Sequence, residues 1–251
     1  MPARRLKATA QRRRRVAPGS VATVVITPEE SIDRKVIQLF ALVGEGLSGA
    51  THALLAADRD AAIKLARADE IVDALQREIE DEVLERIADK RLDLDELTML
   101  IAVLRMLPEI ERSGDLAEHI ARRAVRGLGR EMSARSRGLI EQMGELAARM
   151  WRKATDAFAD RSSNVATAVE ELDDEMDDCH VTLTAEIVAG GMPIPVAIEL
   201  ALIGRFYERF GDHAVNIARR VRSFGPGAGQ RESAPEGDAA PVDRSHDAAP
   251  G

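Results

Sequence analysis

Two segments of this chain carry nearly the same pattern of acidic residues. Residues 111–123 read ERSGDLAEHIARR and residues 208–220 read ERFGDHAVNIARR, and nine of the thirteen positions are identical. Each copy places a glutamate four residues before an aspartate, and this spacing puts both carboxylates on one face of a helix. The two negative charges repel each other, so a bound cation would stabilise each copy. The repeated pattern therefore predicts cation binding at two places.

Further acidic residues are needed, because two carboxylates rarely complete a metal site. The helical segments that precede each copy supply them, again at helical spacing. The candidate ligands are Asp69, Asp73, Glu111, Asp115, Asp173, Glu208 and Asp212, with His119 and Asn216 as further ligands or as side chains that support the ligands. Carboxylate oxygens suit Mg²⁺, Ca²⁺ and Mn²⁺, and a histidine also admits iron, zinc or nickel. We therefore expect divalent or iron-type metal ions.

The two copies of the site differ. Val169 stands at the position that corresponds to Asp69, so we expect the second site to be built differently or to be weaker. Gly114 and Gly211 lie mid-helix, where glycine costs about 1 kcal/mol relative to alanine. Each glycine has two possible explanations. It either allows a neighbouring helix or a ligand to approach closely, or it only relieves crowding between packed side chains. The alternative to a metal site is a solvated acidic face that pairs with neighbouring arginines.

Helical periodicity runs through most of the chain, since apolar residues recur at steps of three and four. Helices are expected over residues 29–57, 60–89, 95–127, 130–159, 162–189 and 193–224. Asp93 can cap the third helix, Pro108 should bend it, and Gly190 with Gly191 should end the fifth. Three long helices, repeated once, predict an all-α fold of two tandem antiparallel three-helix bundles.

Four parts are expected along the chain: a disordered basic arm (1–28), a first bundle (29–128), a second bundle (129–224) and a disordered tail (225–251). Residues 1–20 hold seven basic residues and no acidic one, and the tail carries a net charge of −3. Since the whole chain has a net charge of −8, about −12 remains on residues 21–224. An acidic core of this kind argues against nucleic-acid binding by the core.

Cysteine content and hydropathy indicate the compartment. Cys179 is the only cysteine and cannot form an intramolecular disulfide, which fits a reducing environment. No run of eighteen apolar residues exists in the sequence, so no membrane insertion is expected. A cytoplasmic location is therefore predicted.

The two acidic copies, together with residues 58–88 (DRDAAIKLARADEIVDALQREIEDEVLERIA), resemble the PhoU family of phosphate-transport regulators. The resemblance covers about residues 32–224. It implies two three-helix bundles whose E/DxxxD motifs bind metal ions, here Glu111 with Asp115, Glu208 with Asp212, and Asp69 with Asp73. It also implies a homodimeric accessory protein that couples the ATPase of a phosphate ABC transporter to a sensor histidine kinase and restrains phosphate uptake and starvation signalling.

A carboxylate-bridged di-metal enzyme within a helical bundle is the alternative function. Such enzymes use Glu-x-x-His pairs from two helices. None of the five histidines completes such a pair, and Leu116 and Phe210 stand three residues before His119 and His213. We therefore expect a regulator without catalytic residues.

Overall fold

The computed structural model describes residues 28–66, 69–89, 91–162 and 165–222, which are helical almost throughout and include no strand. The helices are α1 (Pro28–Ala56), α2 (Arg59–Leu65), α3 (Asp69–Ala88), α4 (Leu94–Val125), the short 3₁₀ helix η1 (Leu128–Arg130), α5 (Ala134–Ala159), α6 (Val165–Val188) and α7 (Ile194–Arg222). The prediction of an all-α fold is confirmed. The basic arm and the acidic tail lie outside the described residues.

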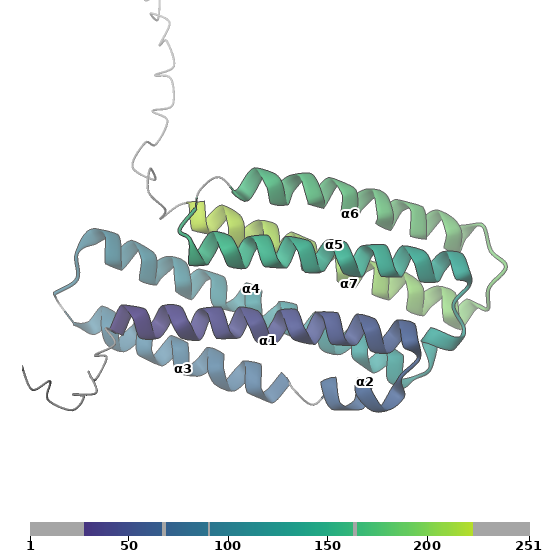
Figure 1. Ribbon diagram of the computed structural model, residues 1–251, viewed down its shortest axis with the longest axis horizontal. Helices are drawn as coiled ribbons and strands as arrows, with labels where there is room; N and C mark the ends of the chain where they lie inside the picture. Colours follow the sequence, from purple (N-terminus) through teal and green to yellow (C-terminus); the bar gives the residue numbers. More distant parts are fainter. Residues whose placement is uncertain (1–27, 67–68, 90, 163–164, 223–251) are drawn as a thin grey trace, which may run out of the picture.

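The helices form two antiparallel three-helix bundles that lie side by side (Figure 1). The first bundle contains α1, α4 and the pair α2–α3, and the second contains α5, α6 and α7. The bundles meet where α1 packs on α5 and α4 packs on α7. One apolar core continues through both bundles, so each repeat buries part of the other. The predicted boundary between residues 128 and 129 falls inside η1 and stays a prediction.

Several helices begin at a capping polar side chain or end at a glycine that the sequence predicts for that role. Asp93 accepts a hydrogen bond from the backbone N–H of Glu96 and caps α4, as expected. After α6, Gly190 and Gly191 take positive φ angles of 79° and 93°, which glycine adopts without strain. Two predicted helices differ from the structure. The 60–89 helix is divided into α2 and α3, and the 130–159 helix begins at Ala134, capped by Ser133.

The first helix is apolar enough to raise the question of a membrane span. Residues 30–56 are long enough to cross a membrane and contain an 18-residue window with a mean hydropathy of 1.3, of which 39% is buried. Its apolar side chains, among them Val36, Phe40 and Leu47, are almost completely buried in the bundle core. The hydropathy of α1 is therefore that of a core helix, which the other helices cover.

A buried polar cluster joins the two bundles along the α4–α7 contact. The Ser113 hydroxyl donates to the backbone oxygen of Glu109 at 2.7 Å, and His213 Nδ1 lies 3.0 Å from Ser113 Oγ. Arg220 donates from one nitrogen to the Glu109 carboxylate at 3.1 Å and from another to the backbone oxygen of Arg105 at 2.8 Å. Because buried polar groups need partners, this cluster favours one relative position of the bundles.

Candidate metal centres

Four carboxylates gather on the outer side of the second bundle, where α6 lies against α7. Asp173 and Asp177 are one turn apart on α6, and Glu208 and Asp212 are one turn apart on α7. All three of the other carboxylates act on the pKa of Asp173. The sequence therefore predicts correctly that helix five would face the ERFGD segment. Asp177 is a residue that the candidate set omits.

Burial and mutual repulsion raise the pKa values in this second cluster. Burial is the largest cause for Asp173, whose pKa rises from 3.8 to about 6, and the charge of Asp212 is the next. Burial also raises the pKa of Glu208, again with Asp212 as the next cause. Arg205 pairs with one oxygen of Glu208, while the other oxygen, Oε2, is buried without a hydrogen-bond partner. Arg205 thus offsets only part of the negative charge of the cluster, and one buried Glu208 oxygen remains without a hydrogen-bond partner.

The raised pKa of Asp173 predicts a pH-dependent stability. The ionised carboxylate is disfavoured in the folded state, so the cost is absent well below pH 3.8, is still small near pH 4 and grows as the pH rises to about 6. We expect Asp173→Asn to stabilise the metal-free protein at pH 7.5 by on the order of 1 kcal/mol, a value discounted for partial exposure. Urea unfolding with a chelator at pH 7.5 and pH 4 measures this. An equal gain at both values would contradict the electrostatic origin.

The corresponding cluster in the first bundle is formed by α3 and α4. The charge of Asp73 on α3 acts on the pKa of Asp115 on α4, so these two candidate ligands from different helices lie near each other. Burial is the first cause that raises the pKa of Asp115, and the charges of Glu118 and Asp73 add to it, while His119 opposes them. Glu111 lies one turn earlier on the same helix and is half-buried. Asp69 begins α3, but its side chain lies outside the described residues.

The two additional candidates, His119 and Asn216, occupy matching positions one turn after the aspartates. The His119 ring packs on Phe206 of α7, with ring centroids 5.3 Å apart, and its Nδ1 is buried without a hydrogen-bond partner. His119 therefore lies between the first cluster and the second bundle. Asn216 is half-buried on α7. Their role as ligands stays a prediction.

Gly211 shows why glycine stands in the middle of α7. A Cβ atom at this position would lie 3.1 Å from Met150 Cε and 3.3 Å from Asp173 Oδ1. The glycine thus allows α6 and its carboxylate to approach α7 closely, which is the first of the two explanations predicted for it. The matching Gly114 lines a small cavity in the first bundle.

The donor atoms in both clusters are mainly carboxylate oxygens, which suit hard cations such as Mg²⁺, Ca²⁺ or Mn²⁺. Two observations in the second cluster fit such a cation: Glu208 Oε2 is buried without a hydrogen-bond partner, and the pKa values of Asp173 and Glu208 are raised. Within the described ranges, no three His, Cys, Asp or Glu side chains already stand close enough together to enclose an ion. Binding would thus require side chains of the cluster to turn toward a common point.

Comparison with known proteins identifies the duplicated fold. The family model for the PhoU domain matches the chain twice, over residues 36–124 and 140–221. These two matches coincide with the two bundles. The chain belongs to the PhoU family. The duplication that the repeated ERxGD segments indicate is therefore the duplication of the PhoU domain.

Curated PhoU relatives resemble the chain over most of its length. A protein of Mycobacterium tuberculosis, called phosphate-specific transport system accessory protein PhoU homolog 1, is 31% identical over 187 residues, which cover 73% of this chain and 85% of the relative. The PhoU homolog of Pseudomonas aeruginosa is 29% identical over 196 residues, which cover 76% of this chain and 81% of the relative.

Solved PhoU structures share the fold. The crystal structure of PhoU from Pseudomonas aeruginosa superposes with a TM-score of 0.73 at 27% identity and covers 78% of this chain and 96% of that one. The phosphate transport system regulatory protein PhoU from Streptococcus pneumoniae superposes with a TM-score of 0.71 at 24% identity, with 77% and 93% covered. The second likeness concerns the fold alone.

Proposed function

We propose that the chain is an accessory regulator of phosphate transport, which acts through contacts with other proteins rather than through catalysis. The observation that carries this proposal is the double match to the PhoU domain over both bundles. The relatives from Mycobacterium tuberculosis and Pseudomonas aeruginosa, named as accessory proteins of the phosphate-specific transport system, support it. Such a regulator works in the cytoplasm.

The partners are the ATPase of a phosphate ABC transporter and a sensor histidine kinase, and the protein works as a homodimer. When phosphate is plentiful, contact with these partners restrains phosphate uptake and starvation signalling. The two-bundle shape offers long helical faces for such contacts (Figure 1). The charge of the sequence is uneven, with seven basic residues among residues 1–20 and a net negative charge on the rest of the chain, so partners of either charge could be attracted.

Metal ions at the two acidic clusters contribute to this role by holding α3 against α4 and α6 against α7. Asp69, Asp73, Glu111 and Asp115 would hold a cation in the first bundle. Asp173, Asp177, Glu208 and Asp212 would hold one in the second. Burial, followed by repulsion from Asp212, raises the pKa values of Asp173 and Glu208; a cation would relieve this repulsion, which supports the proposal.

Phosphate uptake by living cells tests the regulatory role. In a bacterium whose own PhoU homolog has been deleted, expression of this chain is expected to lower the uptake of radiolabelled phosphate and to silence a starvation reporter in phosphate-rich medium. Gly138→Ala changes an exposed position on α5 and serves as the control that should act like wild type. Unchanged uptake and reporter activity, with the protein present at normal level, would contradict the proposal.

A measurement of oxygen consumption distinguishes the alternative function, a di-metal enzyme, from the proposed regulatory role. A di-metal oxidase loaded with iron would consume oxygen with a suitable reductant, whereas a regulator would retain metal without turnover. We expect no consumption above that of free iron. Sustained consumption that is lost in Glu208→Gln would favour the enzyme instead.

A further inference from the structure

The exposed side of the α4–α7 contact carries arginines from both bundles. Arg105 and Arg112 lie seven residues apart on α4, and Arg209 of α7 stands where the first repeat has Arg112. All three are exposed, and none of them forms an ion pair with a carboxylate that the structure describes. Because residues two turns apart share one side of a helix, Arg105 and Arg112 lie along the same side of α4.

Contacts between the helices show that these arginines border one seam. Arg220 of α7 donates to the backbone oxygen of Arg105 at 2.8 Å. Burial is the main cause that lowers the pKa of His213, and the charges of Arg209 and Arg112 add to it, so both guanidinium groups lie near this residue. The arginines of α4 and α7 therefore belong to one face, which we call the α4–α7 face.

The carboxylates along this seam are already paired. Glu199 contacts Arg123 and Arg126, each at 3.1 Å, and Glu109 contacts Arg220 at 3.1 Å. The two acidic clusters lie at the α3–α4 and α6–α7 contacts, to either side of this face. The uncompensated charge of the α4–α7 face is thus positive, although the whole chain carries −8. Salt screens the charges of the far side, because the Debye length is only about 8 Å at physiological ionic strength.

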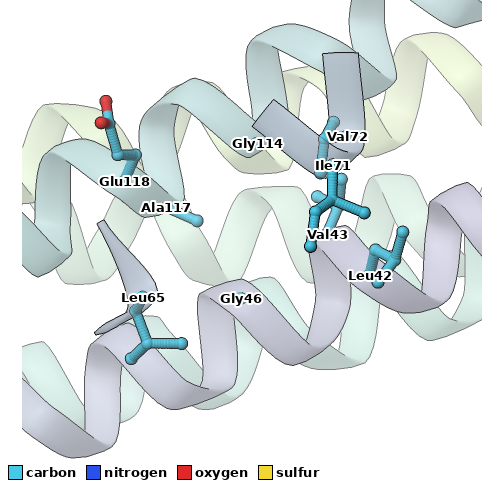
Figure 2. A pocket seen from close by; sticks show the side chains of 9 residues that line it. All are labelled: Leu42, Val43, Gly46, Leu65, Ile71, Val72, Gly114, Ala117 and Glu118. Carbon is cyan, nitrogen blue, oxygen red and sulfur yellow. The ribbon is translucent and has the colours of Figure 1, made fainter. Parts of the chain in front are cut away.

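Aliphatic side chains accompany the arginines. Ile101 of α4 and Ile198 of α7 occupy matching positions of the two repeats and are 38% and 56% exposed, and Leu202 of α7 is 39% exposed. The other side of α4 is occupied within the first bundle, where Gly114 and Glu118 line a small cavity together with α1 and α3 (Figure 2). The α4–α7 face thus combines unpaired arginines with exposed aliphatic groups.

This combination is complementary to the surface of an anionic lipid bilayer. Arginine binds phosphate groups through paired hydrogen bonds, and aliphatic side chains enter the boundary between head groups and acyl chains. The groups are spread along two helices of 32 and 29 residues, so they suit a broad surface better than a small ligand.

We propose that the α4–α7 face docks on an anionic membrane surface, with Arg105, Arg112 and Arg209 at the lipid phosphates and Ile198 and Leu202 at the head-group boundary. The contact is peripheral, because the helices lie along the surface rather than across the bilayer. The proposal goes beyond the regulatory role and does not rest on it, since the partner is lipid rather than protein.

Flotation of the full chain with lipid vesicles, in the presence of a chelator, tests this contact. We expect binding to vesicles of phosphatidylglycerol and phosphatidylcholine in equal parts, and little binding to phosphatidylcholine alone. Arg112→Gln/Arg209→Gln should bind the anionic vesicles about 25-fold more weakly than wild type, because each arginine near such a surface contributes about fivefold. Arg34→Gln/Arg152→Gln removes two exposed arginines from α1 and α5 and should bind like wild type.

All these proteins keep the seven basic residues of positions 1–20, so the comparison isolates the α4–α7 face. Circular dichroism should show the same helix content in each. Equal binding by wild type and Arg112→Gln/Arg209→Gln, or no preference for anionic vesicles, would overturn the proposal. Arginine-dependent binding to poly-glutamate without binding to vesicles would assign the face to an acidic protein and would also overturn it.

A fluorescent label shows which face meets the lipid. In a Cys179→Ala background, a bimane label on Ile198→Cys is compared with one on Leu84→Cys of α3, since both native side chains are 56% exposed. Brominated lipid in the anionic vesicles should quench the label at position 198 at least about threefold more strongly, because that position lies at the head-group boundary. Equal quenching at both positions, or stronger quenching at position 84, would contradict docking through the α4–α7 face.

Discussion

Gly129→Ala is expected to lower the free energy of unfolding by about 3 kcal/mol, because overpacking against rigid backbone cannot be relieved by a rotamer change. A Cβ atom at this position of η1 would lie 2.0 Å from the backbone oxygen of Leu54 in α1. Arg137 donates hydrogen bonds to the backbone oxygens of both Leu55 and Gly129, which ties η1 to the end of α1. The substitution must therefore push apart the connection between the two bundles.

Urea unfolding followed by circular dichroism measures this loss. Gly138→Ala is the matched control, since a Cβ atom there would meet nothing within 4 Å and the residue is exposed on α5. This control should gain up to about 1 kcal/mol, because alanine favours a helix interior over glycine. A Gly129→Ala protein as stable as wild type would show that the close contact of η1 with α1 is wrong.

Much of the fold follows from features that a sequence displays directly. Helical periodicity, Asp93 as a cap and the pair Gly190–Gly191 as a terminator define the long helices locally. The pairing of Asp173 with Asp212 also follows, because four-residue spacing fixes a helix face and short loops make neighbouring helices antiparallel.

Other features depend on packing between distant segments and leave no local trace. The cluster of Ser113, His213 and Glu109 forms only because α4 meets α7, and neither helix alone shows that these positions are buried. The sequence gives no reason to select Asp177, because the repeat alignment pairs Asp73 with Asp173 and places Arg77 opposite Asp177. Val169, which interrupts the predicted motif, is completely buried in the core. The second cluster is thus shifted by one turn along α6.

The second large effect is expected on cation binding by the second cluster. The double variant Asp173→Asn/Asp212→Asn keeps the shape of both side chains and removes two negative charges that repel each other in the metal-free protein. Each lost carboxylate ligand weakens a hard-cation site considerably, since neutral amide oxygens bind such ions less strongly. We expect Mn²⁺ affinity at this cluster to fall by about a hundredfold, and by at least about tenfold, because a ligand is removed. The affinity of the first cluster should not change.

Protonation gives an independent sign of the same site. Because the pKa of Asp173 is about 6, a proton competes with the cation below this pH. Binding by wild type should therefore weaken as the pH falls from 7.5 to 5.5. The double variant, in which position 173 no longer titrates, should lose most of this dependence.

Equilibrium dialysis of Mn²⁺ against purified protein, with bound metal counted by mass spectrometry, tests directly whether the duplicated acidic clusters are cation sites. Wild type, Asp173→Asn/Asp212→Asn and Glu111→Gln/Asp115→Asn are compared with Asp81→Asn/Asp178→Asn, a control that removes two exposed carboxylates outside the described clusters. We expect wild type and the control to bind equally, and each cluster variant to lose the ion of its own bundle. Equal metal content in all four proteins would contradict the assignment of both clusters.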